Sequence, residues 1–343
     1  MTLAHRSYRF ILIFVVVLFI VMVIYRTYPR LPSEHWDFDQ KSYVNIPPTL
    51  ETVRAHRAIE NWVTIPETIV IAGAVYNCEK YLDAVFENIR AVTTLFQDYR
   101  ILISYDDSPD DTLTKLEAWK LKLPQLTILK GRKSSKRRTD NLVLARNRYL
   151  QAMQTMYASQ PFPYFIVMDF DDVCSEPIRL TVLQYMFAQS SKWEALSFPG
   201  KNSYYDIWAL SCAPFWMSYL HFRNPNRALV CAKNFILGEM IKGEWIPVHS
   251  AFGGFAIYKT DPFLKCTYAN SFQKNLSFLT PAMIQAHEQA VVSRMLPTWA
   301  QLVRKWVADD DCEHRYFHFQ ATFGHRARMY IVPVALFAYA DAM

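Results

Sequence analysis

Residues 164–173 read YFIVMDFDDV, a short apolar run that ends in three carboxylates. An apolar run of this length is typical of a buried β-strand. In open α/β sheets ligands bind at the carboxyl ends of the strands, and the run places Asp169, Asp171 and Asp172 there. Clustered carboxylates repel one another. The stretch therefore predicts either a divalent cation that carries a phosphorylated ligand or a solvated acidic turn that caps the next helix.

Strands and helices alternate in the sequence before this run. Shorter apolar runs predict strands at residues 70–75, 101–105 and 126–129. Helical patterns occur at residues 82–92, 113–121 and 141–153. This alternation predicts an α/β domain with a mostly parallel central sheet and flanking helices.

Four short motifs follow one another along these segments. They are Val75-Tyr76-Asn77 with Tyr81-Leu82, Asp106-Asp107-Ser108 with Asp111-Thr112, Leu144-Ala145-Arg146-Asn147, and Met168-Asp169-Phe170-Asp171-Asp172. In this order the motifs resemble the nucleotide-binding half of GT-A glycosyltransferases of the family 2 type, over roughly residues 68–173. The later segments 204–210 and 311–315 resemble a subgroup related to fungal capsule-type α-1,3-mannosyltransferases. The resemblance implies a Rossmann-like GT-A fold.

The resemblance also implies contacts with the nucleoside of a nucleotide sugar. Val75, Tyr76 and Asn77 would line the base and the ribose. Asp107, together with Asp106, would hydrogen-bond the base. The alternative for these residues is a set of polar turns that cap the helices after them.

The diphosphate and a metal ion would lie at the end of the strand in residues 164–168. By resemblance, Arg146 would approach the diphosphate, Asp169 would lie near the ribose, and Asp169 and Asp171 would hold Mn²⁺ or Mg²⁺. Asp172 could take the place of either carboxylate, and His318 could complete the metal shell. A divalent ion stabilises the charge that builds on a departing nucleoside diphosphate. Arg146 could instead lie on the exposed face of a helix.

Residues 309–318 are dense in ionisable side chains. Inverting GT-A enzymes use a carboxylate as general base in a segment at this position, and the predicted bases are Glu313 and then Asp311. A base must lie within hydrogen-bond reach of the hydroxyl that it deprotonates. Glu313 as base favours inversion at the sugar, whereas the mannosyltransferase resemblance favours retention, so the stereochemistry stays open.

Aromatic residues surround one carboxylate at Tyr205, Asp206 and Trp208, and a Gly253-Gly254 turn precedes an apolar run. Aromatic faces stack on sugar rings, and carboxylates bind hydroxyls at the ring edge. Glycines permit close approach of the backbone. These five residues form a candidate sugar or acceptor pocket. The alternative for the aromatic segment is a core strand with an incidental aspartate. The alternative for the two glycines is a turn that only begins a strand.

The amino terminus contains an uninterrupted apolar run at residues 10–25, with arginines on both sides. This pattern predicts an uncleaved membrane anchor, and a cleaved signal peptide is the alternative. The short tail before it and the large body after it favour a single-pass type II membrane protein of the Golgi or endoplasmic reticulum, with a lumenal catalytic domain. The predicted layout is a tail at 1–9, an anchor at 10–26, a stem at 27–66 and a catalytic domain at 67–343, divided into a nucleotide-sugar half (67–175) and an acceptor half (176–343).

Three other features bear on the environment of the chain. The six cysteines are compatible with disulfides but have no metal-binding spacing. Asn275-Leu276-Ser277 is a glycosylation sequon. The net charge of +6 is concentrated at residues 130–138, which predict a basic loop near an anionic donor. A solvated loop is the alternative, and a lumenal domain disfavours nucleic acid as a partner.

Together these features predict a metal-dependent glycosyltransferase. It would move a hexose from GDP-mannose or a UDP-sugar to a hydroxyl of a glycan or glycoprotein. The alternative is a catalytically inactive GT-A-like membrane-anchored protein that binds carbohydrate. A nucleotidyltransferase is disfavoured because the chain lacks a glycine-rich phosphate loop near its amino terminus.

Overall fold

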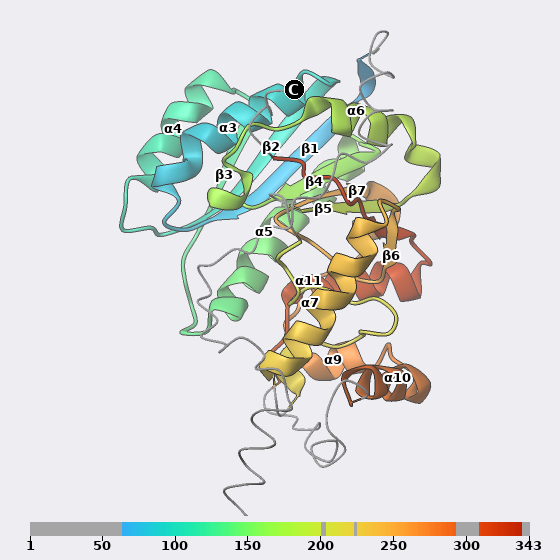
Figure 1. Ribbon diagram of the computed structural model, residues 1–343. Helices are drawn as coiled ribbons and strands as arrows, with labels where there is room; N and C mark the ends of the chain where they lie inside the picture. Colours follow the sequence, from blue (N-terminus) through green and yellow to red (C-terminus); the bar gives the residue numbers. More distant parts are fainter. Residues whose placement is uncertain (1–63, 200–203, 223–224, 293–308, 338–343) are drawn as a thin grey trace, which may run out of the picture. The chain divides into compact units, whose positions relative to one another are not determined.

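The computed structural model describes residues 64–199, 204–222, 225–292 and 309–337 (Figure 1). All of them belong to one compact unit, Tyr43–Met343. The predicted tail, anchor and nearly all of the stem lie outside the described residues. None of the helices in the described part of the chain has the length and apolar character needed to cross a membrane.

The first half of the sheet is parallel, as predicted. Its strands run in the order β3-β2-β1-β4 and are β1 (Ile65–Val75), β2 (Phe96–Asp106), β3 (Leu126–Gly131) and β4 (Tyr164–Met168). The connecting helices are α3 (Glu79–Thr93), α4 (Thr112–Lys122) and α5 (Arg138–Ser159). Since the strands are parallel, their carboxyl ends share one edge of the sheet. The Asp169 motif therefore lies at the same edge as the turns after β1 and β2.

The second half of the sheet is mixed. It adds β7 (Phe255–Lys259), β5 (Ala195–Phe198), β8 (Met329–Ile331) and β6 (Ile246–Val248), in this order beyond β4. The β4–β7, β7–β5 and β8–β6 pairs are antiparallel, and the β5–β8 pair is parallel. The antiparallel β7 next to β4 brings the Gly253-Gly254 turn, which directly precedes β7, beside the Asp169 motif.

Both faces of the sheet are buried, which explains why its strands are almost continuously apolar. Successive side chains of a strand point to opposite faces. Val70 and Ala72 belong to one buried cluster with Tyr149 of α5, whereas Ile69 and Ile71 belong to a second cluster with α3 and α4. Figure 1 accordingly shows α3 and α4 away from α5.

The helices of the second half gather below the sheet in Figure 1. They include α7 (Pro225–Ile241), α9 (Phe272–Leu276), α10 (Pro281–Val292) and α11 (Glu313–Phe319), while α6 (Leu180–Ala188) and the short α8 (Thr260–Phe263) flank the strands. Glu313 is the first residue of α11, which lies below the end of β4 in Figure 1.

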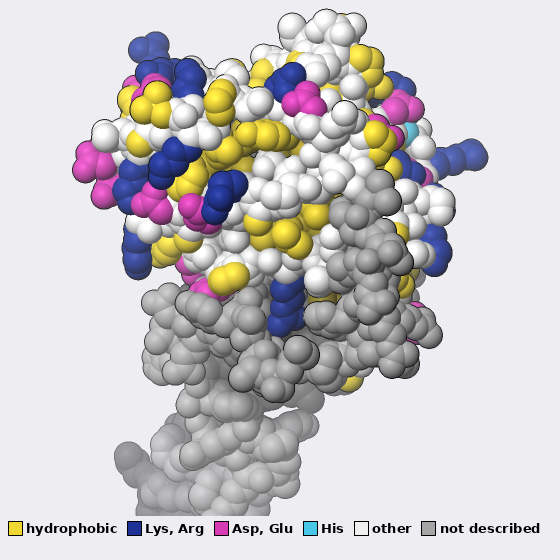
Figure 2. All heavy atoms as spheres, turned by 90° about the horizontal axis from the view of Figure 1, so that it is seen from above, with side chains coloured by type: hydrophobic (Ala, Val, Ile, Leu, Met, Phe, Trp, Pro, Cys, Tyr) yellow, Lys and Arg dark blue, Asp and Glu magenta, His cyan; other side chains and the backbone are white. Residues whose placement is uncertain are grey.

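The surface of the described residues is mixed in charge. Figure 2 shows basic and acidic side chains interspersed on the face seen from above, with apolar side chains between them. This face therefore carries no broad field of one sign that would steer a ligand from a distance.

Candidate active site

The Asp169 motif lies against the two glycines before β7. The Asp169 amide donates a hydrogen bond of 2.8 Å to the Gly254 carbonyl. Gly253 and Gly254 have φ angles of 71° and 87°, in the left-handed region that favours glycine. A Cβ at Gly253 would lie 2.3 Å from the Phe198 carbonyl oxygen, and one at Gly254 would lie 2.5 Å from a Val173 methyl carbon. The glycines are therefore required for this close approach, as the sequence suggested.

Asp169 and Asp171 differ in their surroundings. Asp171 accepts a hydrogen bond of 3.0 Å from the Val173 amide and caps the short turn at Asp172–Cys174, which fixes its direction. The Asp169 side chain is 27% exposed. Burial raises the pKa of Asp169 to about 7; Arg146 opposes this rise, and the nearby Asp171 carboxylate adds to it. A carboxylate with this pKa gains from a divalent cation that replaces its proton.

The donor set fits a cation that shares its ligands with a substrate. Asp169 and Asp171 offer hard carboxylate oxygens, which Mg²⁺ and Mn²⁺ prefer. Across the described ranges, no group of three or more His, Cys, Asp or Glu side chains is arranged to hold a metal ion. The remaining ligands would have to come from donor phosphates and water, as is usual for Mg²⁺.

His318 does not match its predicted role in the metal shell. The ring is fully buried, and its Nδ1 and Nε2 lie 3.0 Å from the Ser250 hydroxyl and 2.9 Å from the Tyr258 hydroxyl. Burial lowers the pKa of His318 to about 3, so the ring is neutral and uses both nitrogens inside the protein. The His318 ring stacks on that of His314, with centroids 5.4 Å apart. The structure makes His318 a packing residue of α11.

Arg146 is buried, so the alternative of an exposed helix face is wrong. Its side chain is only 5% exposed. Nε lies 2.9 Å from Glu313 Oε1, Nη1 lies 3.3 Å from the Tyr149 hydroxyl, and Nη2 lies 3.4 Å from Asp169 Oδ1. These bonds use three of the five N–H groups, and the contact with the diphosphate stays a prediction. The guanidinium joins the donor-side motif to α11.

Glu313 lies at the start of α11 among charged groups of the site. Its carboxylate interacts electrostatically with Asp169 and Asp206, in addition to the ion pair with Arg146. Oε1 accepts from Arg146, whereas Oε2 faces the Cys312 thiol at 4.0 Å. Oε2 therefore keeps acceptor capacity, but Glu313 is 2% exposed, so a hydroxyl reaches Oε2 only after the groups that cover it move. The His314 ring, 3.8 Å from Oε1, is buried without a hydrogen-bond partner at either nitrogen.

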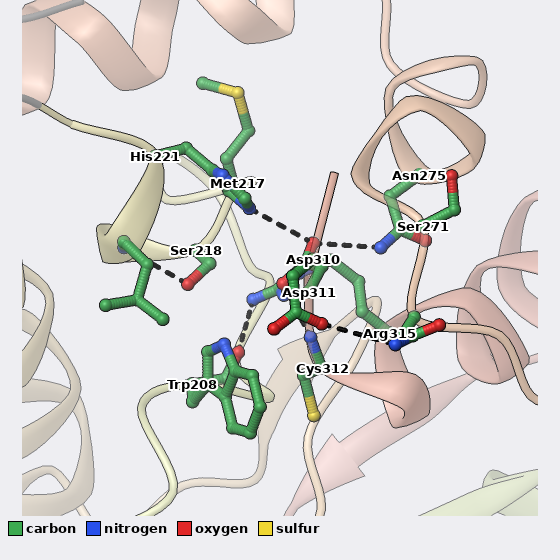
Figure 3. A network of polar contacts seen from close by, with 12 residues as sticks. Trp208, Met217, Ser218, His221, Ser271, Asn275, Asp310, Asp311, Cys312 and Arg315 are labelled. Atoms are coloured by element: carbon green, nitrogen blue, oxygen red, sulfur yellow. Dashed lines mark hydrogen bonds and ion pairs between the residues drawn. The ribbon is translucent and has the colours of Figure 1, made fainter. Parts of the chain in front are cut away.

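Asp311, the second predicted base, is enclosed in a separate network (Figure 3). Its carboxylate accepts 2.6 Å and 2.9 Å hydrogen bonds from Arg315 and Asn275, and the His221 Nε2 atom lies 3.6 Å away. Asp311 is 0% exposed. Asp311 is a poorer candidate for the base than Glu313 because both of its oxygens are already paired, whereas Glu313, which is 2% exposed and so nearly as buried, has one oxygen without such a partner.

The same network corrects the predicted glycosylation site. Asn275 is 1% exposed, and its Nδ2 donates to Asp311 Oδ2 (Figure 3). Nδ2 is the atom to which a glycan would be attached. A glycan there is incompatible with this fold, although the sequon itself is intact.

The turns after β1 and β2 meet at the predicted nucleoside site. Asn77 has a φ of 55°, and its amide donates to the Ser108 hydroxyl at 3.0 Å. The side chain of Asp106 is buried and its Oδ1 is paired with Arg148 at 2.9 Å, and its predicted bond to the base stays a prediction. Asp107 is exposed and stays a candidate for that role. Val75 has its side chain buried in the core, so only its backbone could face a nucleoside.

The basic loop lies beside this nucleoside site. Lys133 Nζ lies 3.2 Å from the centre of the Tyr76 ring, a cation–π contact. The Asn141 side chain holds the loop through bonds with the Ser134 and Ser135 amides and with the Ser135 and Arg137 carbonyls. The loop is thus attached to the start of α5 and presents cations near Tyr76.

The candidate sugar pocket is only partly available to a ligand. Tyr205 is 48% exposed, and its hydroxyl would be 3.3 Å from a Cβ at Gly254, which places the ring beside the Asp169 motif. Asp206 instead accepts backbone hydrogen bonds from Ala209 and Gly253, and burial raises its pKa. The Trp208 carbonyl accepts from Arg315. Tyr205 is therefore the pocket residue with a free face.

Some contributing residues were missed by the sequence analysis. Tyr149 and Tyr268 surround Arg146, and Arg148 neutralises Asp106. No motif marks them, since aromatic residues in a helix or loop are most often core. The six cysteines are all buried and free, so the possible disulfides are not formed.

The family model described as Glycosyl transferase family 2 matches residues 69–231. A search of the curated proteins gives no match.

The solved structures that resemble the chain include two structures of TarS and one of a mannosyltransferase. TarS 1–349 from S. aureus shows 14% identity and a TM-score of 0.33, over 71% of this chain and 59% of that one. TarS 1–349 in complex with UDP-GlcNAc shows 13% identity and a TM-score of 0.38, over 79% and 57%. The mannosyltransferase PcManGT from Pyrobaculum calidifontis, in complex with GDP-Man and Mn²⁺, shows 15% identity and a TM-score of 0.34, over 65% and 55%. The chain thus spans less than two thirds of the length of each of these proteins.

Proposed function

We propose that this chain, a glycosyltransferase with a family 2 domain at residues 69–231, transfers a hexose from a nucleotide sugar to a hydroxyl of a glycan or glycoprotein. The donors to be tested are GDP-mannose and UDP-sugars. The observation that carries the proposal is the pair Asp169 and Asp171 at the end of β4, with Gly254 and Glu313 beside it.

The donor would bind at the carboxyl edge of the parallel strands. Tyr76, Asn77 and Asp107 would contact the nucleoside, and the exposed face of Tyr205 would stack on the sugar ring. Asp169 and Asp171 would hold a divalent ion, which supplies positive charge to the leaving diphosphate. Because Arg146 is committed to Glu313, the chain's own cations nearest to the nucleoside site are those of the loop around Lys133.

The acceptor would approach Glu313. Oε2 of this carboxylate would accept the proton of the acceptor hydroxyl while the oxygen attacks the anomeric carbon. A single base opposite the leaving group gives inversion of configuration. NMR of the product would therefore show the anomeric configuration opposite to that of the donor, and retention would remove Glu313 from this role.

The cellular setting belongs to the same proposal. The apolar run at residues 10–25, with arginines on both sides, supports a type II membrane protein of the Golgi or endoplasmic reticulum with a lumenal catalytic domain. Protease protection of the carboxyl-terminal body in sealed microsomes would test this orientation.

The deciding experiment is donor use by the full-length chain. A panel of UDP- and GDP-sugars would be incubated with Mn²⁺ or with EDTA, with and without mixed glycan acceptors. We expect release of UDP or GDP from one donor that requires Mn²⁺. An absence of both nucleotide binding and release with metal and acceptors present would contradict the proposal.

A further inference from the structure

We infer that Arg146 is a positioning residue that ties the acceptor-side carboxylate of Glu313 to the donor-side carboxylate of Asp169. The inference deepens the proposed function and rests on it. Arg146 comes from α5, Asp169 from the end of β4 and Glu313 from the start of α11, so one side chain joins three elements.

Aromatic rings as well as hydrogen bonds hold the Arg146 guanidinium in place. Phe252 and Tyr268 lie near its faces, with ring centres 5.1 Å and 5.9 Å from Cζ. The Tyr149 hydroxyl lies 3.3 Å from Nη1 and 3.3 Å from the Tyr268 hydroxyl. Arg146 therefore cannot turn toward a ligand without breaking contacts on several sides.

The two ion pairs are unequal, and this inequality suits a positioning role. The contact with buried Glu313 is 2.9 Å, whereas the contact with the more exposed Asp169 is 3.4 Å. The short contact holds Glu313 in place, and the longer contact leaves Asp169 able to take part in binding the nucleotide-sugar donor. The spacing between the acceptor base and the donor motif is then set by one rigid planar group.

Arginine suits this bridge better than lysine. Its planar fork presents separate nitrogens to two carboxylates, whereas an ammonium is one compact charge. Arg146→Lys would keep the charge and lose the bridge. A displacement of about 1 Å in a catalytic group can lower the rate about 100-fold.

The test measures transfer by the full-length chain. We expect Arg146→Lys to lower kcat about 100-fold, while KM for the donor stays within about threefold. If Arg146 acts through Glu313, the double variant Arg146→Lys/Glu313→Gln will be no slower than Glu313→Gln alone. Arg328→Lys is the matched control, since Arg328 pairs with Glu194 outside the site and is expected to keep normal transfer.

Two results of this experiment would overturn the inference. One is a normal kcat in Arg146→Lys with only a lower melting temperature. The other is a normal kcat in Glu313→Gln, because Glu313 would then not be the group through which Arg146 acts. The proposed transferase function would still be supported by donor use in the parent protein.

If the parent protein uses no donor, the proposed function fails and the pairing is judged by stability. Arg146→Met leaves Glu313 buried without its cation, so its melting temperature should fall. Adding Glu313→Gln should then recover most of that loss, and adding Asp169→Asn should recover less. If the two added substitutions recover the melting temperature equally, or if neither recovers it, the inference that Arg146 bridges the two carboxylates is overturned.

Discussion

Two buried arginine–carboxylate pairs have carboxylates that are close in the sequence, Asp311 and Glu313, but their surroundings differ. Arg315 and Asp311 use their polar atoms within the protein: Arg315 also donates to the Trp208 carbonyl (Figure 3), to the Leu210 carbonyl and to the Ser211 hydroxyl. Arg146 and Glu313 are equally buried, but Arg146 also reaches Asp169 beside the donor motif.

The comparison teaches that a buried ion pair does not by itself mark a catalytic site. Both arginines neutralise a carboxylate that burial would otherwise penalise. Only the Arg146 pair is continuous with a partly exposed carboxylate, and only Glu313 has an oxygen without a strong partner. A polar network that ends at a partly exposed carboxylate can act on a ligand, whereas a network whose groups are all paired inside the protein stabilises the fold.

The largest effect is expected from removal of the donor motif itself. Asp171→Ala should lower transfer by roughly 1,000-fold or more, because the leaving diphosphate loses charge stabilisation by the metal. The measurement is Mn²⁺-dependent release of nucleoside diphosphate. EDTA should mimic the variant in the parent protein, and circular dichroism should show an intact fold. Activity that survives both treatments would place the metal elsewhere.

The next prediction separates the two pairs directly. Glu313→Gln should lower kcat about 100-fold or more by loss of the base. Asp311→Asn should instead lower the free energy of unfolding by about 3–5 kcal/mol, because it leaves Arg315 buried without its counter-charge. Parallel kinetics and thermal unfolding check both. The reverse pattern, with Asp311→Asn stable and inactive, would break the comparison.

This difference also shows what the sequence could predict. The strand–helix alternation and the four motifs predicted the parallel half of the sheet, because local apolar patterns decide those elements. Asp311 and Glu313 are two residues apart and chemically alike, so their roles depend on long-range partners. Asn275 and Trp208 reach Asp311 or Arg315 only in the folded chain, and no local pattern encodes such contacts.

A third prediction concerns pH and the open pair. Asp169 has a pKa of about 7 in the fold against an ordinary value of 3.8, so the metal-free protein holds a proton there below pH 7. Mn²⁺ must displace that proton, and its affinity should rise roughly tenfold per pH unit up to about pH 7 and then level off. Titrations monitored by Mn²⁺ electron paramagnetic resonance between pH 5.5 and 8.5 check this. A flat profile would mean that Asp169 is already ionised.

The same shift has a consequence for stability. Since the folded state binds more protons than the unfolded state between pH 4 and 7, the free energy of unfolding of the metal-free protein should fall as pH rises through that range. Asp169→Asn should flatten this part of the profile. No such change is expected from Asp311. Burial acts to raise the pKa of Asp311, but Arg315 and the other partners outweigh this effect and lower the pKa.

The smallest effect is expected at the sequon, where the closed network makes a negative prediction. Ser277→Ala destroys the sequon but leaves the Asn275 side chain on Asp311, and the Ser277 hydroxyl bonds only the nearby Lys274 carbonyl. Stability should change by less than about 0.5 kcal/mol. In a secretory host, the mass of the protein should be the same with and without this substitution apart from the substituted atom. A glycan attached to Asn275 in folded, active protein would mean that the Asp311 network is not closed, and the distinction between the two arginine pairs would fall with it.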